Sequence, residues 1–128
     1  MKKALVVDDC KEASGHLSQM LTRNGYQVIH ADNGEDAINL ASEYLPDLIF
    51  MDIVMPGVNG FQATRQLSKL AETSHIPVIM VSAKNQDVDK QWAQKQGASA
   101  YICKPVEEKL LIATIDDLPT LEDRKKTA

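Results

Sequence analysis

Five side chains that could do chemistry together are spread along this chain of 128 residues. Asp8 and Asp9 form an acidic pair after a short apolar run, and Asp52 follows the apolar run LIFM. Ser82 and Lys104 stand at the ends of two further apolar runs. Three carboxylates held near one another repel by about 4 kcal/mol per pair, at a separation of about 4 Å and an effective dielectric constant of about 20. If the fold brings them together, a proton or a bound cation must compensate.

A hard cation with all-oxygen coordination suits such an acidic cluster. Mg²⁺ fits because it needs few protein ligands and accepts phosphoryl oxygens as further ligands. An ionised aspartate can also attack phosphorus and form an aspartyl phosphate. The Lys104 ammonium could then meet the phosphoryl charge, and the Ser82 hydroxyl could donate a hydrogen bond to it. Taken singly, each residue is better explained as a turn, a cap or a surface side chain, so only the combination indicates chemistry.

Alternating short and long segments must position these residues. Short apolar segments rich in valine and isoleucine predict strands over 3–8, 27–31, 47–52, 76–82 and 98–103. Between and after them, apolar residues three and four apart predict helices over 11–24, 34–44, 60–71, 87–96 and 106–118. This alternation predicts an α/β fold, a five-stranded parallel sheet with helices on both faces. Ligands bind beyond the carboxyl ends of such strands, which is where the five reactive residues stand.

Length and composition limit the number of domains and the kinds of partner that the protein can have. The length favours one domain over residues 1–118, followed by a polar tail over 119–128. Fourteen basic against 18 acidic residues give a net charge of -4, which argues against nucleic acid as the main partner. No apolar stretch approaches the roughly 20 residues of a membrane span, so we expect a cytoplasmic protein without a membrane partner. Cys10 and Cys103 lack metal or C-x-x-C spacing, and we expect two buried thiols in a reducing compartment.

Four motifs carry a resemblance to a known family. The segments LVVDD, MDIVMPGVNG, VIMVSAK and YICKP resemble the receiver domain of two-component response regulators over about residues 1–118. The spacings are similar too, with 43 residues from Asp9 to Asp52, 30 more to Ser82 and 22 more to Lys104. The resemblance implies a flavodoxin-like sheet of order 2-1-3-4-5 in a monomeric signalling protein that is not a conventional enzyme.

The resemblance also implies the role of each site residue. Asp52 would accept a phosphoryl group from a phosphohistidine on a partner histidine kinase. Mg²⁺ would be held by Asp8, Asp9, Asp52 and the backbone carbonyl of Val54. Lys104 would pair with the acyl phosphate.

The switch and loop residues follow from the same resemblance. Ser82 would swing towards the phosphoryl group, and Tyr101 would move inward behind it. Pro56 and Gly57 would shape the turn that aims Asp52. The peptide bond before Pro105 would be cis.

Three further side chains are candidates for tuning or binding. Val54 and Lys84 would flank the attacking water and set the lifetime of the phosphate. Trp92 is either a core residue or, with Tyr101, part of a partner-facing surface, since tryptophan is favoured at binding hot spots.

Longer segments, among them GFQATRQLSK and QWAQKQGA, resemble the single-domain regulators of twitching motility, which govern type IV pili. A chemotaxis regulator, or a phosphate sink in another chemosensory pathway, is the nearest alternative. A phosphatase with an aspartyl intermediate is a third, although such enzymes carry D-x-D after the first strand where this chain has Asp8-Asp9. A flavin or nucleotide module would need a glycine-rich or hydroxyl-rich loop there instead of DDCKE.

Overall fold

Strands and helices alternate along the whole described chain. The computed structural model describes residues 2–55, 57–83 and 86–118. The strands are β1 (Lys2–Val7), β2 (Tyr26–Ala31), β3 (Leu48–Met51), β4 (Val78–Ser82) and β5 (Ala100–Cys103). The helices are α1 (Lys11–Arg23), α2 (Gly34–Tyr44), α3 (Gly60–Lys69), α4 (Asp87–Lys95) and α5 (Glu108–Asp116). None of these helices, within the described ranges, is long and apolar enough to span a bilayer.

The sheet is parallel throughout, and its order β2-β1-β3-β4-β5 confirms the expected topology. Its register decides where the reactive residues stand. Val7 pairs with Met51, so the next residues, Asp8 and Asp52, leave the sheet side by side. On the other side of β3, Ser82 of β4 pairs with Cys103, directly before Lys104.

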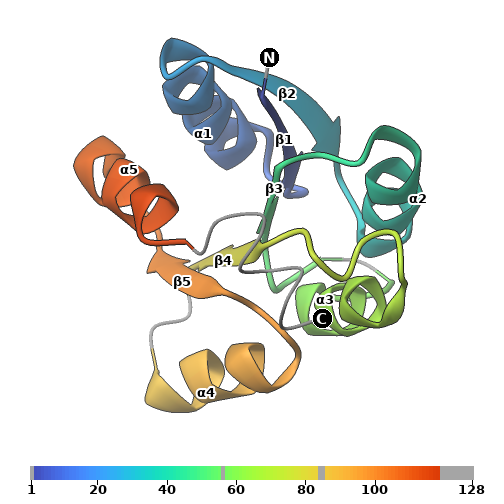
Figure 1. Cartoon of the computed structure of the whole chain (residues 1–128). Helices are drawn as coiled ribbons and strands as arrows, with labels where there is room; N and C mark the ends of the chain where they lie inside the picture. The colour runs from blue at the N-terminus through green and yellow to red at the C-terminus, as the bar shows by residue number, and fades with distance from the viewer. Residues whose placement is uncertain (1, 56, 84–85, 119–128) are drawn as a thin grey trace.

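Two apolar layers hold the sheet between its helices (Figure 1). Side chains alternate along each strand, so Leu5 and Val7 face one layer while Ala4 and Val6 face the other. One layer packs under α2, α3 and α4, and the other packs under α1 and α5. Strands buried on both faces explain the nearly continuous apolar runs of β1, β3 and β4.

The predicted boundaries are right to within two residues, and these small differences are informative. Asp8 and Asp52, predicted as strand ends, lie just outside β1 and β3. Residues 76 and 77 precede β4, where proline has no N–H to donate. The predicted helix over 106–118 begins only at Glu108, and Val106 lies buried in the core before the helix. Pro56, Lys84 and the expected tail over 119–128 lie outside the described residues.

The prediction of two buried thiols is wrong. Cys10 is exposed because it directly precedes α1, in the connection that follows the carboxyl end of β1. Cys103 is half-buried because it stands on β5, an edge strand.

Candidate functional site: an acidic cluster at the carboxyl edge of the sheet

Main-chain hydrogen bonds fix the reactive residues just beyond the strand ends. The Asp52 N–H donates to the carbonyl of Val7 (2.9 Å), and the Lys104 N–H donates to the carbonyl of Ser82 (2.9 Å). The Asp8 N–H donates to the carbonyl of Ala31 (3.1 Å). These bonds extend the sheet pairing by one residue. The site therefore takes its geometry from the sheet rather than from a loose loop.

The structure brings the three predicted acids together. Carboxylate oxygens of Asp8, Asp9 and Asp52 all lie within 4.8 Å of one another. The Lys104 ammonium lies 2.8 Å from Asp8 Oδ2 and 3.6 Å from Asp52 Oδ1. Asp52 Oδ1 also accepts a hydrogen bond from the Ile53 N–H (2.9 Å). With all groups ionised, three negative charges and one positive charge leave an excess of two negative charges.

The pKa values of Asp52 and Lys104 reflect both burial and the neighbouring charges. The pKa of Asp52 is raised to about 6, first by burial and then by the charge of Asp8, although Lys104 and the Ile53 N–H oppose the rise. Burial lowers the pKa of Lys104, but its hydrogen bond to Asp8 and the nearby carboxylates outweigh that effect and raise it. A cation beside Asp52 would favour its ionised form.

The donor set fits a hard divalent cation. It offers carboxylate oxygens only, and the excess of two negative charges matches the charge of Mg²⁺. Asp52 is buried, at 7% exposed, while Asp9 is exposed and Asp8 lies between these extremes, so the cluster opens to solvent on one side. The Val54 side chain is 61% exposed, and the predicted ligation by its backbone carbonyl stays a prediction.

The two predicted switch residues touch each other. Ser82 is buried at the end of β4, and Tyr101 is half-buried on β5. Burial raises the pKa of the Tyr101 hydroxyl, while a hydrogen bond with Ser82 partly offsets the rise. Tyr101 also packs against the core layer under α4. The pair thus links the acidic edge to the side of the sheet near α4.

The loops around the site contain both predicted and unpredicted features. Gly57 has a φ of +73°, a conformation that favours glycine, and the Lys104-Pro105 bond is cis, as the resemblance implied. The Asn59-Gly60 pair indicates a turn from sequence, but Gly60 has a more specific position. A β-carbon on Gly60 would overlap the carbonyl oxygen of Asp52. No sequence signal distinguishes this close approach from an ordinary helix start.

The fold and the acidic edge define a class of signalling protein. Residues 4–116 match the family described as the response regulator receiver domain, and the chain belongs to that family. It is 53% identical to the protein PilH of Pseudomonas aeruginosa over 116 residues, covering 91% of this chain and 96% of PilH. A receiver domain is a signalling protein rather than a conventional enzyme.

Solved structures agree with this assignment. The chemotaxis protein CheY4 of Vibrio cholerae superimposes with a TM-score of 0.86 at 27% identity, covering 93% of this chain and 99% of CheY4. The receiver domain of a Pseudomonas aeruginosa sensor histidine kinase has a TM-score of 0.85 at 25% identity, covering 91% of this chain and 96% of that domain. That structure is described with a magnesium ion coordinated in its active site cleft.

Proposed function

We propose that Asp52 accepts a phosphoryl group from the phosphohistidine of a histidine kinase, in a reaction that requires Mg²⁺. One observation carries the proposal. A buried carboxylate lies within 4.8 Å of two other acids and 3.6 Å from a lysine ammonium, at the edge of the sheet where such folds bind ligands. The magnesium-bound receiver domain among the similar structures supports the choice of cation.

The chain's own residues have distinct tasks in this step. A carboxylate oxygen of Asp52 attacks phosphorus, the P–N bond breaks, and its electron pair returns to the imidazole of the donor. Asp8, Asp9, Asp52 and the carbonyl of Val54 would hold Mg²⁺, which would reduce the repulsion between carboxylate and phosphoryl oxygens. Lys104 lies 3.6 Å from Asp52 and pairs with a phosphoryl oxygen as that charge arrives.

Phosphorylation then acts on the Ser82–Tyr101 contact. It adds a charge of about -1.5 to -2 and three acceptor oxygens to Asp52. Ser82 turns its hydroxyl to that charge and releases Tyr101, which packs inward and changes the surface formed by α4, β5 and α5. Gly57 and Pro105 keep the flanking loops in shape, and Val54 flanks the path of the attacking water and helps to set the lifetime of the phosphate. The predicted roles of Pro56 in the turn and of Lys84 in the phosphate lifetime fall on residues outside the described ranges.

Intact-protein mass spectrometry tests the chemistry. Incubation with Mg²⁺ and acetyl phosphate should add the mass of one phosphoryl group, and EDTA should prevent the gain. Asp52→Asn should take up none, whereas Asp117→Asn, which removes an exposed carboxylate at the end of α5, should be labelled like the parent. Labelling of Asp52→Asn to the same extent would refute the assignment of the acceptor.

For the biological role we propose a cytoplasmic, monomeric regulator of type IV pili, driven by the histidine kinase of a pilus chemosensory system. The resemblance to PilH at 53% identity supports a pilus-associated role, and the similarity to CheY4 is lower, at 27%. Deletion should alter pilus-driven surface spreading and leave swimming intact. Unchanged spreading with altered swimming would favour the chemotaxis alternative.

A further inference from the structure

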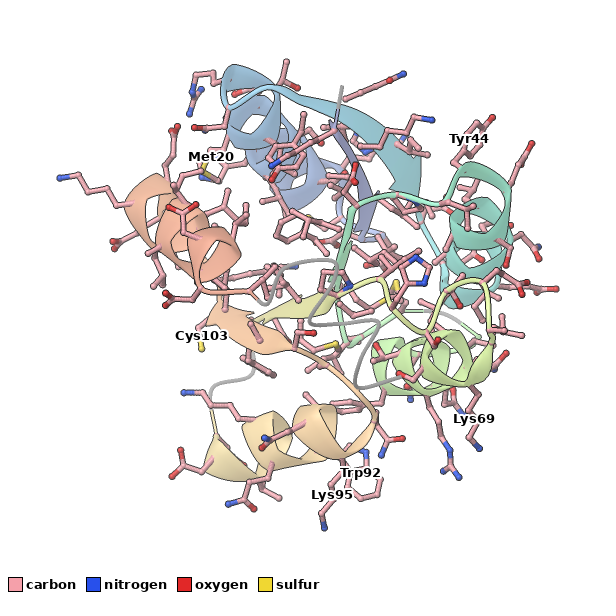
Figure 2. The ribbon with its side chains drawn as sticks, in the orientation of Figure 1. Met20, Tyr44, Lys69, Trp92, Lys95 and Cys103 are labelled. Atoms are coloured by element: carbon pink, nitrogen blue, oxygen red, sulfur yellow. The ribbon has the colours of Figure 1, made fainter. Side chains whose placement is uncertain are left out.

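A groove with a basic rim lies between α3 and α4. It has a volume of about 470 Å³ and is lined by Arg65, Ser68, Lys69, Trp92, Lys95, Gln96 and Gly97. Figure 2 shows Lys69, Trp92 and Lys95 on one side of the molecule, over these two helices. In a parallel α/β sheet the helices run back against the strands, so the last turns of α3 and α4 lie at the edge opposite the acidic cluster. We call this feature the basic groove.

The floor of the basic groove is held by specific contacts. The Ser68 hydroxyl of α3 lies 2.9 Å from the carbonyl of Thr64 and 3.1 Å from the carbonyl of Gln96, and so links α3 to the end of α4. Gly97 follows directly, and a β-carbon there would overlap Ser68. Trp92 packs edge-on against Phe61, with ring centroids 6.5 Å apart. The groove is thus built before any ligand arrives.

Its charges are exposed, and none of them forms an ion pair within the described chain. The ion pairs among the described residues join Arg23 to Glu108 and Lys104 to the acids of the site, so none involves Arg65, Lys69 or Lys95. The lining contains no aspartate or glutamate among those residues either. Lys69 and Lys95 lie in the last turns of α3 and α4, where a positive charge interacts favourably with the helix dipole.

That effect does not explain the other two side chains. Arg65 lies in the middle of α3, and Trp92 remains 50% exposed although it is a large apolar side chain. An indole flanked by three cations is the composition of a binding surface, because tryptophan and arginine are enriched at interface hot spots.

We propose that the basic groove docks an acidic segment of a partner protein, with an apolar side chain of that segment packed on Trp92. Charge complementarity selects this occupant. The chain carries a net charge of -4, so an acidic partner is repelled over most of the surface and attracted here. Arg65 can bind a carboxylate through two parallel hydrogen bonds, while Lys69 and Lys95 act as point charges. Three cations on an acidic protein are a poor match for a nucleic acid backbone.

Trp92 is the chain's single tryptophan, so its fluorescence reports binding without a label. The probe is a short synthetic peptide of glutamate and leucine, titrated into the full chain at low salt. We expect a saturable change in emission and a Kd that rises with salt, as charges become screened beyond about 10 Å at 0.1 M. The triple variant Arg65→Gln, Lys69→Gln and Lys95→Gln should raise the Kd roughly tenfold. A matched peptide with glutamine in place of glutamate should bind the parent at least as weakly as the glutamate peptide binds the triple variant.

A matched variant separates this groove from general charge. Lys2→Gln, Lys90→Gln and Lys109→Gln remove the same charge from exposed positions outside the groove and should leave the Kd unchanged. Three results would overturn the proposal: an equal rise of the Kd in this control variant, binding of the glutamine peptide as tight as that of the glutamate peptide, or tighter binding of a single-stranded oligonucleotide than of the glutamate peptide. Both triple variants should still be phosphorylated on Asp52, so failure of the groove and failure of the phosphoacceptor are distinguishable.

Discussion

The acidic edge and the basic groove differ in how far their charged side chains are buried and paired. At the edge, Asp8 and Asp52 are largely buried and share one ammonium, and burial and these neighbouring charges shift the pKa values of Asp52 and Lys104. In the groove, Lys69 and Lys95 are exposed and have no carboxylate partner in the described chain. Buried charges must be compensated within the fold, whereas exposed charges remain available to another molecule. Substitution of the charged residues of the edge should therefore change stability strongly, whereas substitution of the charged residues of the groove should matter only when a partner is present.

The largest effect is expected at the glycine that packs on Asp52. Gly60→Ala places a β-carbon on the carbonyl of Asp52, so the free energy of unfolding should fall by about 3 kcal/mol. Gly15→Ala is the control, because Gly15 is also helical and has open space around it; it should stabilise by about 0.5–1 kcal/mol. Urea denaturation measures both changes. Equal effects in the two variants would contradict the close approach at Gly60.

A lysine from each region makes the comparison direct. In EDTA at neutral pH, Lys104→Gln leaves Asp8 and Asp52 without their cation and should cost about 2 kcal/mol of unfolding free energy. Lys95→Gln should stay within about 0.5 kcal/mol of the parent because that side chain is exposed. If both substitutions cost the same, the contrast between edge and groove fails. Thermal or urea unfolding under matched conditions decides the point.

The raised pKa of Asp52 makes stability depend on pH. Between its ordinary pKa of 3.8 and about 6, the folded chain keeps a proton that the unfolded chain has lost. Stability of the metal-free protein should therefore fall as pH rises through this window and stay lower above it. Asp52→Asn abolishes the effect and should be more stable by about 2 kcal/mol at pH 7, with little difference below pH 4. Denaturation series across this range provide the measurement, and a difference independent of pH would count against the raised pKa.

A smaller effect is expected at the floor of the basic groove. Gly97 has a φ of +104° and lies against Ser68, so Gly97→Ala should cost about 1–2 kcal/mol. Adding Ser68→Ala should recover part of the lost stability, because removal of the Ser68 hydroxyl relieves the overlap with the new β-carbon. The part that is not recovered is the backbone strain at residue 97. A double-mutant cycle separates the two parts. Strict additivity would show that Gly97 and Ser68 do not pack against each other.

Much of the fold and of the acidic edge follows from the sequence. Apolar runs mark the strands, and the order of parallel strands brings their carboxyl ends to one edge, so Asp8, Asp9, Asp52, Ser82 and Lys104 could be predicted to meet. Strand ends are well defined by sequence because a charged residue directly after an apolar run marks the place where burial stops.

The remaining features depend on tertiary contacts that leave little local signal. The close approach of Gly60 to the carbonyl of Asp52, the Ser82–Tyr101 hydrogen bond and the basic groove each involve segments that are separate in the sequence. The helical spacing of Trp92 fits either a core or a surface position, and the structure shows that it packs against Phe61 while remaining half-exposed. The absence of metal or C-x-x-C spacing predicts a buried Cys103, but this residue stands on an edge strand, which leaves one side open.

A crystal soaked in Mn²⁺ as an anomalous substitute for Mg²⁺ tests the central claim most directly. The account predicts one strong anomalous peak at the carboxyl edge of the sheet, with metal–oxygen distances of about 2 Å to Asp52 and to at least one of Asp8 and Asp9. Asp52→Asn should weaken that peak. A clear peak elsewhere with none at this edge, or carboxylates that have moved apart around empty density, would contradict a divalent cation beside the phosphoacceptor.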